Sequence, residues 1–193
     1  MLEEQNPQNR LDELRVGDNS LLLYRDGYEL YAARLGAIDG AQESIYLESS
    51  IWRDDEAGRA LKQHLSQKAV PSNTMLVDRI TCSSFTQCLQ AGMRLYGSRK
   101  GELRSKTCTI DGQWSTIGSA RLDLLSSVVN YELNIEIYEV AFAAQMQDLF
   151  ASDIADAFEL SLTNWLSRPW HRMVIHANLR TVNELKQTLL LED

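Results

Sequence analysis

Strand-like and helix-like segments alternate along residues 20–157, and this alternation limits the possible folds more than any other feature. The clearest strand covers 130–138, where Leu133, Ile135 and Ile137 fall on one face. The clearest helix covers 140–157, with an apolar stripe made of Phe142, Met146, Leu149, Phe150, Ile154 and Ala157. Such alternation predicts the α/β class.

The remaining elements follow from shorter signals. We expect further strands at 21–24, 44–52, 74–77, 93–96, 104–110 and 114–117, and further helices at 28–41, 56–67 and 84–91. Asp26-Gly27 and Asp111-Gly112 are typical turn pairs, the second of them a hairpin turn. Asp54-Asp55 can cap the helix at 56–67.

The chain divides into three parts by composition. Residues 1–19 form a polar lead-in, residues 20–168 form the α/β domain, and residues 169–193 form an amphipathic C-terminal helix. The C-terminal helix can pack on the domain or lie on an anionic lipid surface. The acidic end of the chain counts against the lipid surface.

Charge and composition exclude several classes. The net charge of −8 argues against a nucleic-acid binder, which needs a basic face. No apolar segment is long enough for a membrane span, and residues 1–10 lack the apolar region of a secretory signal. The three cysteines lack CxxC spacing, so we expect neither disulfides nor a zinc site, and a cytoplasmic location.

One segment, residues 103–132, carries a spaced set of polar residues. Lys106 is followed after five positions by Asp111, and Gly118-Ser119 follows after six more residues. Asn130 and Glu132 complete the set. This pattern resembles the phospholipase D superfamily motif, H-x-K-x4-D followed by G-S-x-N and N-x-E. Two positions depart from it, because Arg104 stands in the His position and Arg121 in the Asn position.

The flanking sequence is similar to bacterial cardiolipin synthases. Residues 26–27, 45–52 and 54–58 resemble the start of their first repeat, whereas 89–96, 119–134 and 165–170 resemble their second motif region and its end. Members of this type carry two motif copies, so this chain resembles the opening of one repeat joined to the close of the other. We expect the seam at 78–85. The chain is either a natural single-repeat form or an internally shortened relative.

The resemblance implies one repeat of the phospholipase D-like fold, a mixed β-sheet flanked by helices on both faces. It also implies phosphatidyl transfer through a phosphohistidine, without a cofactor or metal. Arg104 cannot act as nucleophile or acid, because a guanidinium stays protonated near neutral pH. His64, His171 and His176 have no motif context. The catalytic positions that remain are those of Lys106, Asp111, Ser119 and Glu132, and a phosphate-binding set would contain Arg104, Lys106, Ser119 and Arg121.

Three hypotheses follow. The chain is an impaired phosphatidyltransferase of the cardiolipin synthase type, a non-catalytic binder of phosphate or lipid headgroups, or a plain α/β interaction domain. The partners implied are an anionic phospholipid of the phosphatidylglycerol or cardiolipin type, and a second copy or a complete enzyme. Contact with the inner membrane surface would be peripheral.

Each motif residue also has a simpler interpretation. Lys106 could lie on a solvated strand face, and Asp111-Gly112 could be only a turn. Gly118-Ser119 could cap a helix, and Glu132 could be an exposed carboxylate.

Overall fold

The computed structural model describes residues 13–17, 19–53, 55–68, 70, 72–79, 85–99, 105–123 and 131–167. Three sequence expectations therefore lie outside the described residues. They are the C-terminal helix at 169–193, the seam residues 80–84, and the motif positions Arg104 and Asn130.

The described residues form one sheet of nine strands, together with five helices. The strands are β1 (Leu14–Val16), β2 (Asn19–Asp26), β3 (Ser44–Ile51), β4 (Ser72–Arg79), β5 (Arg94–Ser98), β6 (Thr107–Ile110), β7 (Trp114–Gly118), β8 (Tyr131–Tyr138) and β9 (Ala157–Glu159). The helices are α1 (Gly27–Gly40), α2 (Glu56–Gln67), α3 (Phe85–Gln90), α4 (Val140–Ala155) and α5 (Leu162–Leu166).

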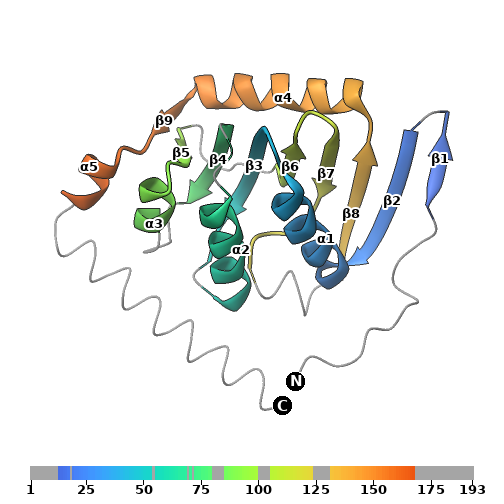
Figure 1. The fold of residues 1–193 in the computed structure, drawn as a ribbon, viewed down its shortest axis with the longest axis horizontal. Coiled ribbons are helices and arrows are strands. Elements are labelled where there is room, and N and C mark those ends of the chain that lie inside the picture. The colour runs from blue at the N-terminus through green and yellow to red at the C-terminus, as the bar shows by residue number, and fades with distance from the viewer. Residues whose placement is uncertain are drawn as a thin grey trace, which may run out of the picture.

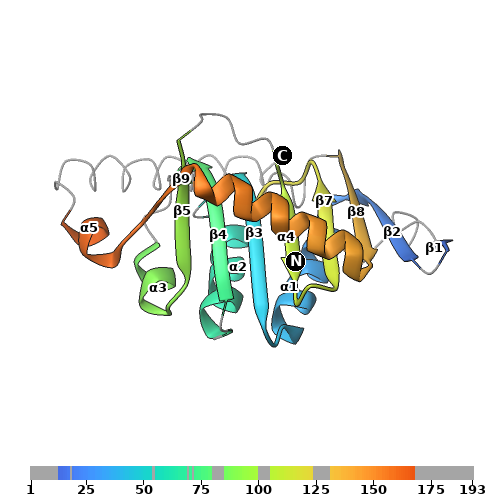
Figure 2. The same ribbon diagram turned by 90° about the horizontal axis from the view of Figure 1, so that it is seen from above.

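The sheet has the strand order β1-β2-β8-β7-β6-β3-β4-β5-β9 (Figure 1). β4 pairs in parallel with both β3 and β5, and the other pairs are antiparallel. Helices α1 and α2 lie on one face and α4 crosses the other, as Figure 2 shows from above. The predicted α/β class, a mixed sheet with helices on both faces, is confirmed.

The main core lies between the sheet and helices α1 to α3. Its buried members come from both sides of the expected seam, with Ile45, Leu61 and Met75 before it and Phe85 and Leu95 after it. The aromatic rings of Trp52, Phe85 and Trp165 continue the core towards α5, with successive centroids 5.4 Å apart. The two parts of the chain thus share one core.

Several local expectations differ from the structure at the sheet edges. β1 lies inside the expected lead-in, because Gly17 takes a φ of +63° that lets the chain turn back onto β2. Asp26-Gly27 is no separate turn, since β2 runs directly into α1. α4 ends at Ala155, Ala157 belongs to β9, and Leu149 is 49% exposed rather than on the buried stripe.

Candidate phosphate-binding end of the sheet

The β6-β7 hairpin separates the motif residues into two groups. Its turn residues Asp111 and Gly112 have φ values of +52° and +61°, so the predicted Asp-Gly hairpin turn is confirmed. The Asp111 carboxylate accepts hydrogen bonds from the backbone N–H groups of Gln42, Glu43 and Ser44, at 2.8 to 2.9 Å. Asp111 therefore holds the loop between α1 and β3.

The electrostatics of Asp111 agree with this role. Partial burial acts to raise the pKa of the Asp111 carboxyl, but the backbone donors, led by Ser44, hold that pKa below its usual value. Lys106 lies at the other end of β6, and five residues of extended chain span roughly 15 Å. Among the described motif residues, the structure does not bring Asp111 together with Lys106, Ser119 or Glu132.

The opposite end of the hairpin brings Lys106, Ser119 and Glu132 together. The backbone N–H of Gly118 donates to the carbonyl of Lys106 at 3.3 Å, which places Ser119 just beyond the paired strands. The Ser119 hydroxyl donates to Oε2 of Glu132 and accepts from the backbone N–H of Leu133 at 3.1 Å. Glu132 is 8% exposed, so its interpretation as a solvated carboxylate is wrong.

Residues 120–123 connect this end to β3. Leu122 forms a parallel bridge with Trp52, and its carbonyl accepts from the backbone N–H of Arg53 at 3.2 Å. The Arg53 guanidinium forms an ion pair with the buried Asp123 at 3.3 Å. The described part of this segment contains no helix, so Gly118-Ser119 does not cap a helix over these residues.

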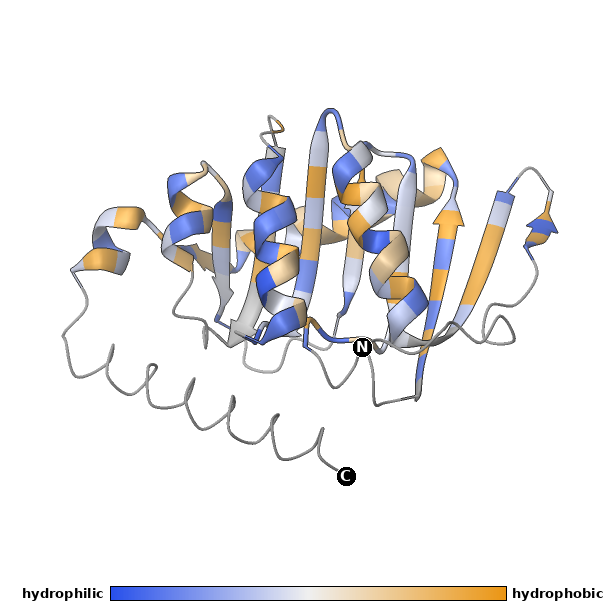
Figure 3. Ribbon diagram, turned by 60° about the horizontal axis from the view of Figure 1, so that its bottom comes forward, coloured by the Kyte–Doolittle hydropathy of each residue, from blue (hydrophilic) through white to orange (hydrophobic). Residues whose placement is uncertain are grey.

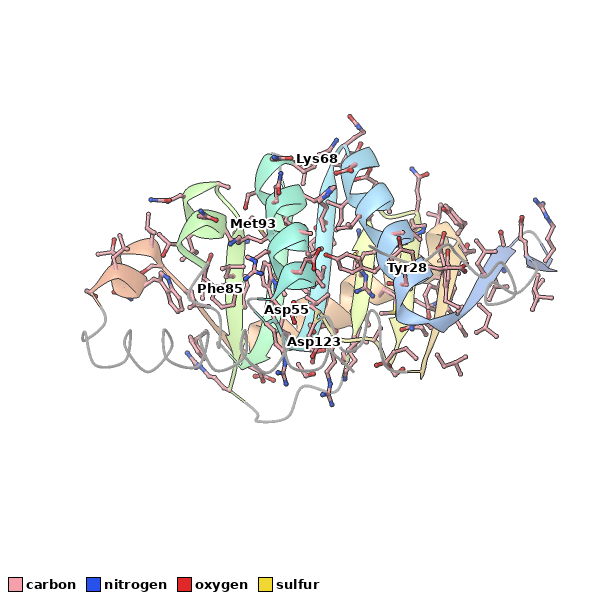
Figure 4. All side chains as sticks on the ribbon, turned by 90° about the horizontal axis from the view of Figure 1, so that it is seen from below. Tyr28, Asp55, Lys68, Phe85, Met93 and Asp123 are labelled. Atoms are coloured by element: carbon pink, nitrogen blue, oxygen red, sulfur yellow. The ribbon has the colours of Figure 1, made fainter. Side chains whose placement is uncertain are left out.

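The N-terminus of α2 lies at the same end. Asp55 caps this helix, since its carboxylate accepts from the backbone N–H of Gly58 at 2.9 Å, which confirms the predicted cap for that residue. Figure 4 shows Asp55 and Asp123 near each other, with Lys68 at the far end of α2. Lys68 also lowers the pKa of Asp111, which agrees with Asp111 being at that far end.

This end of the sheet thus combines a lysine, an exposed hydroxyl and the exposed side chain of Arg121. Lys106 is half-buried, Arg121 is exposed, and the Arg53 guanidinium is already paired. An ammonium and a hydroxyl that is held in place suit the oxygens of a phosphate. Among the described residues, no group of three or more His, Cys, Asp or Glu has the arrangement of a metal site.

Three buried polar features escaped the sequence interpretation. On the α4 side of the sheet, Glu48 is 2% exposed, and its Oε2 accepts from the Thr107 hydroxyl at 3.1 Å. Burial, together with the charge of Asp153, raises the pKa of Glu48 to about 7. On the α1 side, Asn134 and Glu136 are buried, and Glu136 accepts from the Tyr24 hydroxyl at 2.5 Å.

Comparison with known proteins identifies the fold and the family. In solved structures, the chain is similar to Nuc, a phospholipase D family member from Salmonella typhimurium, with a TM-score of 0.62 and 17% identity, covering 75% of this chain and 99% of that one. It is also similar to phosphatidylserine synthase from Haemophilus influenzae, with a TM-score of 0.61 and 16% identity, covering 77% and 40%. At these identities the likeness shows the fold.

Curated relatives are more similar in sequence. Cardiolipin synthase A of Pectobacterium carotovorum is 32% identical over 104 residues, which are 53% of this chain and 21% of that protein. Cardiolipin synthase A of Yersinia pseudotuberculosis is 33% identical over 103 residues, again 53% and 21%. The chain therefore spans about a fifth of the length of these relatives.

Within the described residues, no helix is long and apolar enough to cross a bilayer. The family model described as "Cardiolipin synthase, PLD-like domain" matches residues 35–154. This range includes Lys106, Ser119 and Glu132, which lie at the end of the sheet described above. The chain belongs to the phospholipase D superfamily, in the family of the phospholipase D-like domain of cardiolipin synthases.

Proposed function

We propose that this chain binds the phosphate of an anionic phospholipid headgroup, of the phosphatidylglycerol or cardiolipin type, without turning it over alone. The observation that carries the proposal is that Lys106 and the Ser119–Glu132 pair lie at one end of the sheet. The family membership supports a phospholipid-related role. The protein is then a phosphatidyltransferase by descent that retains the binding residues.

The cations at this end would supply the attraction to phosphate. The Lys106 ammonium would contact phosphate oxygens, and the Ser119 hydroxyl would donate to another once its proton turns from Glu132 Oε2 to the ligand. Arg121 is exposed on the same segment and can approach as a second cation. Arg104 lies outside the described residues, so its part rests on its chemistry and its motif position alone.

The lack of turnover follows from the residue in the His position. Covalent transfer needs a lone pair that attacks phosphorus, and the guanidinium of Arg104 offers none near neutral pH. His64 does not compensate, because its Nδ1 lies 2.6 Å from Asp39 Oδ1, between the C-terminal turns of α1 and α2. That is the Asp111 end of the molecule, away from Ser119.

A transfer assay tests the catalytic half of the proposal. Purified chain incubated with phosphatidylglycerol vesicles should form no cardiolipin, whereas the variant with Arg104→His and Arg121→Asn should acquire acid-labile phosphate on the protein. Transfer by the unchanged chain at the rate of a two-motif enzyme would contradict the proposal. A double variant that folds but neither dimerises nor takes up phosphate would favour the interaction-domain hypothesis.

We also propose that the chain pairs with a second copy, or with a complete enzyme of the same family. The α4 side of the β1-β2-β8 edge exposes apolar side chains, with Leu14, Val16, Leu133 and Val140 each 58 to 64% exposed. Val16 also lines a groove of about 380 Å³, together with the apolar side chains of Leu21, Ile137 and Phe142. Figure 3 shows hydrophobic residues, in orange, along much of β2 and at intervals along β8. Burial of such a surface favours association.

The pairing proposal agrees with the chemistry of the family resemblance. One motif copy supplies one set of phosphate ligands, and a second domain would supply the other. The net charge of −8 opposes broad attraction to an anionic membrane, so membrane contact would be peripheral and would depend on the local headgroup site. Light scattering across a dilution series measures the association, and a monomer at every concentration would contradict pairing between copies.

A further inference from the structure

Asn134 occupies a central place beneath the Ser119 segment. It lies on β8, where it is directly opposite Gly118 of β7 on one side and Tyr24 of β2 on the other. Its side chain is buried, with 1% exposed. A buried amide has to be accounted for, because every unpaired polar atom in it costs free energy.

The carbonyl oxygen of this amide has a specific partner. Asn134 Oδ1 accepts the backbone N–H of Ala120 at 3.1 Å. Ala120 lies just beyond the end of β7 and follows Ser119 directly. The hydrogen bond therefore holds the chain where it leaves the sheet, one residue beyond the hydroxyl of the proposed phosphate site.

Gly118 allows the amide to reach across. A Cβ atom on Gly118 would lie 2.0 Å from Asn134 Oδ1 and 2.5 Å from its Cγ, far inside contact distance. The φ angle of Gly118 is not positive, so the backbone conformation does not call for glycine. Glycine is required here because there is no room for a Cβ atom. Gly118 and Asn134 therefore act as one unit.

Three consecutive residues of β8 hold the three residues 118–120. Glu132 accepts from the Ser119 hydroxyl. The Leu133 carbonyl accepts from the backbone N–H of Ser119 at 3.1 Å, and the Leu133 N–H donates to the Ser119 hydroxyl. Asn134 holds Ala120. Ser119 is thus restrained on both sides, and Asn134 supplies the restraint that follows it.

The other half of the amide gives no comparable benefit. Asn134 Nδ2 is buried and has no hydrogen-bond partner within the described structure. A buried unpaired donor lowers stability. An apolar side chain would avoid that loss, so the advantage of asparagine at this position lies with its carbonyl oxygen.

We propose that Asn134 is a positioning residue, which fixes residues 118–120 so that Ser119 presents its hydroxyl to a bound phosphate. This inference rests on the proposed phosphate site. It predicts that loss of the Asn134 acceptor both increases the mobility of the backbone at Ala120 and weakens phosphate binding. Asn134 itself would not touch the ligand.

The test compares Asn134→Leu, which keeps a similar volume without an acceptor, with Asn134→Asp, which keeps one. Thr116→Val is the matched control, because Thr116 is 1% exposed on the same sheet face and its hydroxyl also has no hydrogen-bond partner among the described residues. Hydrogen exchange of the Ala120 amide, measured by NMR, reports the restraint. Titration with dihexanoyl-phosphatidylglycerol reports binding.

Asn134→Leu should raise Ala120 exchange roughly tenfold, as expected for the loss of one hydrogen bond, and weaken binding by a similar factor. Asn134→Asp and Thr116→Val should change both far less. Should Asn134→Leu fail to fold, Asn134→Ala removes the same acceptor with a smaller side chain and replaces it in the test.

The outcomes separate this inference from the proposed function. Unchanged Ala120 exchange in Asn134→Leu overturns the positioning role, and so does faster exchange with unchanged binding. If the wild-type chain does not bind the lipid, the proposed phosphate site fails. In that case the exchange data still decide whether Asn134 restrains residues 118–120.

Discussion

Replacement of Glu48 by glutamine should change how the stability of the fold depends on pH. Glu48 is 2% exposed, and its pKa is raised from 4.5 to about 7, first by burial and then by the charge of Asp153 on α4. One of its oxygens, Oε1, is buried without a partner among the described residues. The folded protein therefore holds a proton on Glu48 that the unfolded chain releases near pH 4.5.

The sign and size of the effect follow from proton linkage. Between pH 4.5 and 7 the folded state binds the additional proton, so the free energy of unfolding falls as pH rises. The stabilisation is complete below the unfolded pKa and is lost once the pH passes about 7. Each tenfold change in proton affinity corresponds to about 1.4 kcal/mol, so the loss is roughly 3 kcal/mol.

Urea denaturation, followed by circular dichroism at pH 5 and pH 8, measures this loss. The wild-type chain should lose roughly 2.5 kcal/mol more between these values than Glu48→Gln, whose amide does not ionise, because a small part of the stabilisation is already lost at pH 5. Asp148→Asn serves as the control, because it removes an exposed carboxylate from α4, the helix that carries Asp153. Equal pH dependence in wild type and Glu48→Gln would refute the reasoning, because the buried carboxyl would then titrate at its usual pKa.

Three further predictions follow from other contacts. Asp111→Ala should lower the free energy of unfolding, measured by urea denaturation, by roughly 2 kcal/mol, because three backbone N–H groups lose their acceptor. Lipid binding should remain unchanged, and loss of binding would place Asp111 in the site. Gly58→Ala should prevent stable folding, since its Cβ would lie 1.8 Å from the Arg53 carbonyl oxygen, and resistance to limited proteolysis equal to wild type would contradict this close approach. Val16→Asp with Leu14→Asp should shift the chain towards monomer in analytical ultracentrifugation, and an unchanged distribution would exclude that surface.

The motif spacing predicted part of the site because its residues are close in the chain. Lys106 directly precedes β6 and Ser119 directly follows β7, so the hairpin formed by these strands brings the two residues close in space. The cap at Asp55 is equally local. The contacts of Asp111 could not be predicted in this way. Its partners at 42–44 are distant in the chain, and the motif spacing gives no sign of them.

The buried polar residues could not be predicted for a related reason. In 130–138 the alternation correctly separates Ile135 and Ile137 from Asn134 and Glu136. It does not show that the polar face is covered as well, by α1 and its neighbours. The edge strands β1 and β9 likewise depend on partners elsewhere in the sheet and are too short for a periodic signal.

The most direct test of the central claim is a titration of the purified chain with dihexanoyl-phosphatidylglycerol, followed by ³¹P NMR. Saturable binding should occur in the wild type and in the control Lys62→Gln, whose lysine lies on α2, and should weaken at least roughly tenfold in Lys106→Gln. The phosphorus signal should remain that of intact lipid. Equal binding by Lys106→Gln, or conversion of the lipid, would contradict a non-catalytic headgroup site at this end of the sheet.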